Sequence, residues 1–396
     1  MSDVIPCFSE DIWFEILKNL PVKTLGKCRC VCKSWHFLIV SPFFMGAHLK
    51  HYTQNDASSL ILCKEITKRS ETEEFEQCIF FRDLVQLRQG NRLHTSVCPL
   101  DVSFCGPCRF YFVGSVNGLL CISDNGYLRP TQRIFIWNPL IQKSIKLSQS
   151  TTDKYSVVGF GYDCRRNDYR VIKISSLCRR KQFLVEVYSI QERRWRIISA
   201  KYLIDNSMIK FISASHLFYN GVIHWLIRVN MLLLFNVSDE TFAKMELPQG
   251  LAKVALSTIG LFEYQGKLSV SYCSLTPHHE FRLSPECQIW VKRDSNYLEC
   301  SWCKILCIGV GMLPDLCHLG PVEYLGENQE LIGFSKVIDG EPGPLVSYNP
   351  KTKEIKEFGL RMTRSTKFSA FSESLSLLDQ KIDDLTTDEL EMSKTA

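Results

Sequence analysis

A hairpin unit that recurs about every fifty residues restricts the fold of this sequence more than any other feature. Each copy is a short apolar strand, a polar turn, and a second strand that starts with basic or aromatic residues. The alternation of apolar and polar residues predicts a half-buried β-hairpin in every copy. The five copies comprise residues 134–139 with 145–147, 185–189 with 195–198, 232–236 with 245–247, 289–292 with 302–305, and 345–350 with 355–358.

Three of these hairpins are preceded by a glycine turn and a further strand. The turns are at Asn117-Gly118, Asn220-Gly221 and Gln265-Gly266. One such unit cannot bury both faces of its sheet, so the units must stack around an axis. The repeat length is typical of kelch-like blades, and it predicts a large all-β propeller of about six blades. We expect the connecting region and first strands at 51–109 and the main β domain at 110–378, with residues 374–378 closing the ring near 59–62.

Residues 8–39 follow a helical pattern instead. Ser9 is suited to an N-cap, and Glu10 and Asp11 place negative charge in the first helical turn. Pro21 predicts the end of this helix, and two further helices are expected before Pro42. The side chains expected to face inward recur at helical spacing: Ile12, Ile16, Leu17, Leu20, Leu25, Cys28, Val31, Cys32, Trp35, Leu38 and Ile39.

A block of about forty residues is too small to bury a core of its own. Its apolar surface therefore needs a partner. Two interpretations follow from this shortfall: the block docks onto another protein, or it caps the C-terminal domain of its own chain.

The block also resembles the F-box family, which we expect over residues 5–50 as three helices. The resemblance lies in Glu10-Asp11, Glu15-Ile16-Leu17, residues 20–25, residues 31–35 and Leu38-Ile39. It implies docking onto the Skp-type adaptor of a cullin-based (SCF) ubiquitin ligase. One departure is that Phe8-Ser9 stands where the family has Leu-Pro, which predicts weaker docking. The residues expected to contact the adaptor are Phe8, Ile12, Ile16, Leu17, Leu20, Pro21, Leu25, Val31, Cys32 and Trp35.

The β domain resembles the plant F-box-associated domain, through residues 114–123, 136–139, 159–163 with 167–171, and 185–189. Within that family, residues 371–378 are similar to the ends of S-locus F-box and S-locus F-box-like proteins of the rose family. The resemblance implies a substrate-recognition subunit that contributes no catalytic residue or cofactor. Its partners would be the adaptor, through it cullin and a RING subunit, and a protein target for degradation. Pistil S-ribonucleases of pollen self-incompatibility are one implied target, and an unrelated target or a scaffold outside ubiquitination are the alternatives.

Composition agrees with a cytoplasmic adaptor, with the nucleus as a second expected location. The start of the chain lacks the basic and apolar regions of a signal peptide, so the 18 cysteines are expected to be reduced. No apolar run reaches the roughly 18 residues of a membrane helix. Residues 379–396 contain six acidic residues and two lysines, a net −4, so the rest of the chain carries +9 of a total of +5. We expect an acidic flexible tail there, and scattered rather than nucleic-acid-binding basic charge elsewhere.

Four motifs suggest other chemistry. Cys105 and Cys108 have the spacing of a thiol oxidoreductase, but a β-forming run follows them instead of a helix. Cys105 and Cys108 together with Cys300 and Cys303 would supply four zinc ligands. We favour a buried structural role for these cysteines over a zinc site. His278-His279-Glu280 lacks the helical spacing of a zinc protease, and residues 159–161 lack the glycine and helix of a phosphate loop. We expect Ile136-Trp137 and Ile289-Trp290 to be core. Sequence therefore predicts no metal and no enzyme.

Overall fold

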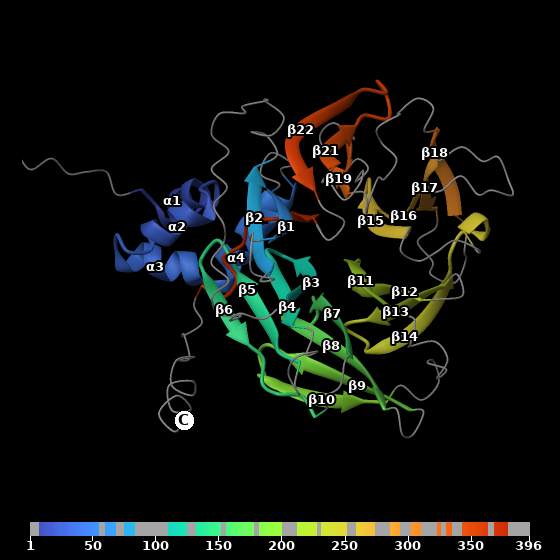
Figure 1. Ribbon diagram of the computed structural model, residues 1–396. Coiled ribbons are helices and arrows are strands. Elements are labelled where there is room, and N and C mark those ends of the chain that lie inside the picture. Colours follow the sequence, from blue (N-terminus) through green and yellow to red (C-terminus); the bar gives the residue numbers. More distant parts are fainter. Residues whose placement is uncertain are drawn as a thin grey trace, which may run out of the picture.

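The computed structural model describes residues 8–54, 60–68, 75–83, 110–124, 132–151, 156–177, 182–199, 212–227, 231–251, 259–273, 286–293, 302–309, 323–325, 330–334, 343–362 and 368–378. A group of helices at the N-terminus projects from one side of a large β region (Figure 1). The predicted acidic tail, the Cys105-Cys108 pair, Cys300 and the His278-His279-Glu280 motif lie outside the described residues.

The described N-terminal segment contains four helices, one more than predicted: α1 (Glu10–Lys18), α2 (Val22–Cys28), α3 (Lys33–Val40) and α4 (Pro42–Gln54). Ser9 occupies the N-cap position of α1 with extended backbone, but its side chain makes no capping hydrogen bond. Pro21 separates α1 from α2 as expected.

The third helix ends before Pro42 as predicted, at Val40, but Pro42 then begins a fourth helix, α4, which the sequence pattern does not predict. Proline is tolerated in the first turn of a helix, where its missing N–H has no intrahelical partner to lose. Ser41 supplies the cap: its Oγ accepts a hydrogen bond from the Phe44 N–H at 3.2 Å. The Met45 N–H then donates to the Ser41 carbonyl at 3.0 Å, which closes the first turn.

The described strands of the β region form one three-stranded and five four-stranded antiparallel sheets. The first four-stranded sheet has the order β3 (Phe110–Val116), β4 (Leu119–Asp124), β5 (Ile134–Asn138), β6 (Lys143–Lys146), and the second has the order β10 (Arg194–Ile198), β9 (Gln182–Ser189), β8 (Asp168–Leu177), β7 (Ser156–Asp163). The third has the order β11 (Ile212–Tyr219), β12 (Val222–Ile227), β13 (Met231–Asn236), β14 (Thr241–Glu246), and the fourth has the order β15 (Ile259–Tyr264), β16 (Lys267–Cys273), β17 (Glu286–Lys292), β18 (Trp302–Gly309). The fifth has the order β19 (Glu323–Leu325), β20 (Glu330–Phe334), β21 (Gly343–Tyr348), β22 (Ile355–Met362), and the three-stranded sheet has the order β2 (Phe75–Asp83), β1 (Leu60–Lys68), β23 (Phe368–Phe371).

The five predicted hairpins are confirmed, as β5–β6, β9–β10, β13–β14, β17–β18 and β21–β22. The three glycine turns are confirmed as well. Each places two successive residues in the left-handed region, for example Asn220 at φ 47° and Gly221 at φ 75°. Positive φ at both central positions matches the twist of the flanking strands, which is why an Asn-Gly pair fits this turn.

Each sheet contacts its neighbours through one strand, which is the first strand in chain order for the five four-stranded sheets and β23 for the three-stranded sheet. β3 contacts β7, β7 contacts β11, β11 contacts β15, β15 contacts β19, β19 contacts β23, and β23 contacts β3. The three-stranded sheet combines both ends of the β region, because Leu60–Cys63 of β1 pairs with Phe368–Phe371 of β23. The prediction had placed residues 374–378 in this pairing. Those residues instead leave the sheet and turn, with the Leu378 N–H donating to the Leu375 carbonyl at 3.0 Å.

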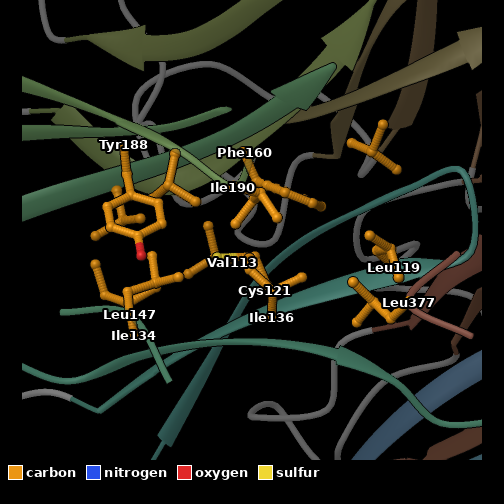
Figure 2. Close-up of a cluster of buried hydrophobic side chains, with 13 residues drawn as sticks. Val113, Leu119, Cys121, Ile134, Ile136, Leu147, Phe160, Tyr188, Ile190 and Leu377 are labelled. Atoms are coloured by element: carbon orange, nitrogen blue, oxygen red, sulfur yellow. The ribbon is translucent and has the colours of Figure 1, made fainter. Parts of the chain in front are cut away.

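The core lies between adjacent sheets. Figure 2 shows one such cluster, in which Ile136, Phe160 and Tyr188 meet from three different strands. Ile136, Trp137 and Ile289 are buried, as predicted, and Trp290 is partly buried against a neighbouring cluster.

The glycines at 159 and 161 serve this packing, because the indole of buried Trp225 lies directly over Gly159. A Cβ at Gly159 would come within 2.3 Å of the Trp225 Cζ2. Gly159-Phe160-Gly161 runs within strand β7 and is not a loop before a helix, so it has no cradle for a phosphate.

Candidate adaptor-docking surface

One side of α1 presents an apolar stripe to solvent. Phe8, Ile12 and Ile16 remain 46%, 44% and 43% exposed. Ile12 and Ile16 are spaced four residues apart, so they lie above one another along α1, and Phe8 lies just before the N-cap residue Ser9. Asp11, Glu15 and Asn19 line the same shallow groove as Ile12 and Ile16. The stripe is therefore apolar at its centre and acidic at its edge.

Two aromatic residues outside the predicted set are exposed further still. Phe37 on α3 is 69% exposed and Phe43 on α4 is 77% exposed, comparable to the predicted contact Val31 at 67%. The signal for Phe37 was in the sequence: if Trp35, Leu38 and Ile39 face inward, helical geometry turns Phe37 outward. Phe43 lies on α4, the helix that the three-helix prediction does not include.

A chain of aromatic rings connects Phe8 of the stripe with α1 and α3. Phe8 and Trp13 meet edge to face with centroids 5.5 Å apart, and Trp13 meets Trp35 at 4.8 Å. Edge-to-face pairs at this separation contribute beyond simple burial. Trp35, predicted as a contact, is only partly exposed, so it links α1 to α3 as well as reaching the surface.

Leu17 and Leu25 differ from the other predicted contacts, because both are fully buried inside the chain. They belong to a core cluster with Val22, Ile39 and Phe44, against which Leu20 and Trp35 also pack. A side chain with no exposed surface cannot contact a partner, so Leu17 and Leu25 hold the helices together. Pro21 and Cys32 are exposed.

The chain itself completes this helical core. Leu375 and Leu378 belong to the same cluster, and Leu140 and Ile141 of the β5–β6 turn pack against it. The interpretation of the block as a cap on its own C-terminal domain is therefore correct for the inner face. It leaves the stripe of Phe8, Ile12 and Ile16 unexplained.

His48 ties α4 to the turn between α1 and α2. It is fully buried, and one ring nitrogen lies 3.0 Å from the Leu20 carbonyl oxygen, to which it donates. Burial lowers the pKa of His48, the bond to Leu20 opposes that shift, and nearby His51 lowers the pKa further. His48 is thus held neutral at physiological pH.

Among the described residues, no group of three or more His, Cys, Asp or Glu side chains is placed to hold a metal ion. Within the same part of the chain, no helix is long and apolar enough to cross a membrane. Eight cysteines are free thiols: Cys28, Cys30, Cys32, Cys121, Cys164, Cys287, Cys303 and Cys307.

Comparison with known proteins identifies both parts of the chain. Residues 68–384 match the F-box associated beta propeller domain, and residues 5–45 match the F-box domain. The first match spans most of the sequence, so the chain belongs to the family of F-box proteins with an F-box-associated β-propeller domain.

Similar curated proteins come from Arabidopsis thaliana. An F-box/kelch-repeat protein is 31% identical over 169 residues, 40% of this chain and 42% of the relative. The F-box protein CPR1 is 28% identical over 171 residues, 41% of this chain and 36% of the relative. The chain thus aligns with well under two thirds of each. Among solved structures, the β-propeller domain of the trilobed protease from Pyrococcus furiosus has 8% identity and a TM-score of 0.36, covering 82% of this chain and 94% of that one.

Proposed function

We propose that this protein is the substrate-recognition subunit of an SCF ubiquitin ligase, found in the cytoplasm or nucleus. The F-box docks onto a Skp-type adaptor, and the β region binds a protein target. Cullin and a RING subunit, recruited through the adaptor, bring a ubiquitin-charged enzyme close to that target. Catalysis then arises from raised effective concentration, so this chain needs no reacting side chain.

One observation carries the docking part of the proposal. The helical unit already packs its inner face on its own chain, yet Ile12 and Ile16 on α1, and Phe8 just before it, stay exposed. Water-exposed apolar side chains gathered on one helix face mark an interaction site. An adaptor groove that is apolar at its centre and basic along the edge beside Asp11 and Glu15 fits this stripe.

The test is a pull-down with a Skp-type adaptor. The α1 variant carries both Ile12→Asp and Ile16→Asp in the full chain. The matched control is Ile197→Asp on β10, an isoleucine of the β region that is 59% exposed and lies far from α1 along the chain. We expect the α1 variant to lose the adaptor and the β10 variant to keep it. Equal recovery of adaptor by both variants would refute docking through α1.

For the β region we propose a closed propeller of six blades, over a domain that covers residues 110–378 and the first strands before it. The contacts between consecutive first strands, and the contact of β23 with β3, support closure. The pairing of β1 with β23 supports a last blade built from both ends of the domain. Radial stacking of this kind leaves only short sheet edges, which protects a β domain against edge-to-edge association.

A narrower hypothesis names pistil S-ribonucleases as the target, as the resemblance of residues 371–378 implies. Those ribonucleases tend to be basic, and the chain outside its acidic tail carries +9. Overall charge therefore gives no attraction, and local patches would have to supply it. A binding panel of S-ribonucleases tests this hypothesis, and absence of binding at micromolar concentration contradicts it without affecting adaptor docking.

A scaffold that acts with the adaptor alone is the competing role. The two roles differ in turnover: a ligase subunit has at least one bound protein whose level rises when the proteasome is inhibited. Affinity purification with mass spectrometry, with and without inhibitor, separates them. If no captured protein accumulates on inhibition, the scaffold role replaces the ligase role.

A further inference from the structure

The last residue of β23 and the seven residues after it connect the two parts of the molecule, and we name residues 371–378 the C-terminal clip. Five of its side chains are almost fully buried: Phe371, Ser374, Leu375, Leu377 and Leu378. Leu377 has φ 71°, a left-handed conformation that leucine rarely adopts. This turn lets neighbouring side chains point to different elements.

One side of the clip is fixed to the first sheet. Leu377 packs with Leu119 and Ile136 in the cluster of Figure 2. The Asn138 side-chain amide donates to the carbonyl oxygens of Ser374 and Ser376, at 2.8 and 2.9 Å.

Two further contacts hold the same side. The Lys143 ammonium donates to the Leu378 carbonyl at 2.7 Å. Gly118 leaves room for the clip to cross its turn, because a Cβ there would come within 2.3 Å of the Ser374 Cβ.

The other side of the clip is fixed to the F-box. Leu375 and Leu378 enter the helical core beside Leu17 and Leu25. The Glu373 carboxylate accepts a hydrogen bond from the Val22 N–H at 2.9 Å, across 351 positions of sequence. Val22 is the first residue of α2, where a negative charge is favourable. Burial, followed by the charge of Glu373, raises the pKa of Tyr52 on α4 to about 12, so this carboxylate lies close to α4 as well.

We propose that the C-terminal clip is a positioning segment that fixes the F-box in one orientation on the β region. The helices are joined to the β region by the chain between α4 and β1 and by the packing of Leu140 and Ile141 on the helical core. Glu373, Leu375 and Leu378 add a hydrogen bond to Val22 and two buried leucines, and these contacts hold the helices in one orientation. The functional consequence rests on the proposed function. A fixed orientation of the F-box sets the distance between the adaptor and the bound target, and the effective concentration of ubiquitin-charged enzyme at the target depends on that distance.

The experiment compares two kinds of substitution in the full chain. Leu375→Ala with Leu378→Ala, and separately Glu373→Ala, detach the F-box side. Leu377→Ala is the matched control, since it shortens an equally buried leucine of the same segment that packs on the β side. Glu373→Gln is the conservative variant, because its amide oxygen can still accept from Val22.

Three measurements are made: small-angle scattering of the chain alone, scattering of the chain with adaptor, and hydrogen exchange of the α2 amides. We expect the F-box-side variants to widen the distribution of interatomic distances, with adaptor affinity within about threefold of the parent. Exchange in α2 should rise about fivefold in Glu373→Ala and recover in Glu373→Gln. Leu377→Ala should leave the distance distribution unchanged.

Unchanged scattering in the F-box-side variants refutes the proposal, and so does an equal widening by Leu377→Ala. If the variant with both Leu375→Ala and Leu378→Ala loses its helices, the proposal is tested by Glu373→Ala instead, through its hydrogen exchange in α2 and its scattering. Failure of the parent chain to bind adaptor refutes the proposed function instead, and scattering of the chain alone still tests the clip.

Discussion

Gly159→Ala is expected to destabilise the β region although it adds only one methyl group. Gly159 lies on β7, and Trp225 on the neighbouring sheet is fully buried against it. The added Cβ would lie 2.3 Å from the Trp225 Cζ2 and 3.1 Å from the Cε2 and Cη2.

The magnitude follows from these distances. Carbon atoms in contact prefer roughly 3.5–4.0 Å, so the ring or the strand must move by about 1.2 Å. The interior is close-packed and has no space for such a shift at little cost. Overpacking of this kind typically costs about 1–3 kcal/mol, and a backbone-linked clash with a fully buried indole places Gly159→Ala toward the upper value.

The assay is denaturant unfolding of the full chain, followed by tryptophan fluorescence, in a double-mutant cycle with Trp225→Phe. Phenylalanine lacks the Cζ2 ring atoms that clash, so the double variant should recover about 1 kcal/mol relative to additivity. Gly46→Ala is the control, because nothing lies within 4 Å of a Cβ there. A cost below about 0.5 kcal/mol, or full additivity with Trp225→Phe, would refute the packing role of Gly159.

Three further substitutions test the other arrangements. Asp163 is fully buried; burial alone would raise its pKa, but hydrogen bonds from Arg166, Ser238 and two backbone amides outweigh it and lower the pKa. The stability that ionised Asp163 contributes is present above the pKa of this group in the unfolded chain, and it is lost as pH falls through the lower pKa of the folded protein. In acid unfolding curves, wild type should therefore lose stability below about pH 4 more steeply than Asp163→Asn. His48 has a lowered pKa, so protonation disfavours the folded helices; stability should fall as pH drops below 6.5, and His48→Gln should flatten this dependence in circular dichroism melts. Ser41→Ala removes the cap of α4 and should cost about 1 kcal/mol, read as faster hydrogen exchange in the first turn of α4 with the β sheets unaffected.

The hairpins of the β region could be predicted from sequence because their information is local. Alternation of apolar and polar residues defines a strand, and pairs such as Asn117-Gly118 define the turn between strands. Both signals lie within ten or so residues, and the structure confirms each hairpin.

The sequence does not show which apolar side chains pack against the chain's own core and which remain exposed. Ile16 and Leu17 are adjacent in one apolar stripe, yet one is 43% exposed and the other fully buried. Periodicity identifies the stripe without saying which part of it meets the chain's own core. The clip was misplaced for a similar reason: its apolar residues resemble a strand, whereas contacts with Val22 and Asn138, hundreds of positions away, hold it in a turn.

Both errors concern the same helical core, and together they distinguish the two interpretations of the helical block. If the block were only a cap, the clip and the β5–β6 turn would be expected to cover its apolar surface. They cover Leu17 and Leu25 but leave Phe8, Ile12 and Ile16 in solvent. If the block were only a docking module, it would not need Glu373 and two leucines from the far end of the chain. Both sets of contacts are present, so the helical unit has an inner face that fixes its orientation and an outer face suited to a partner.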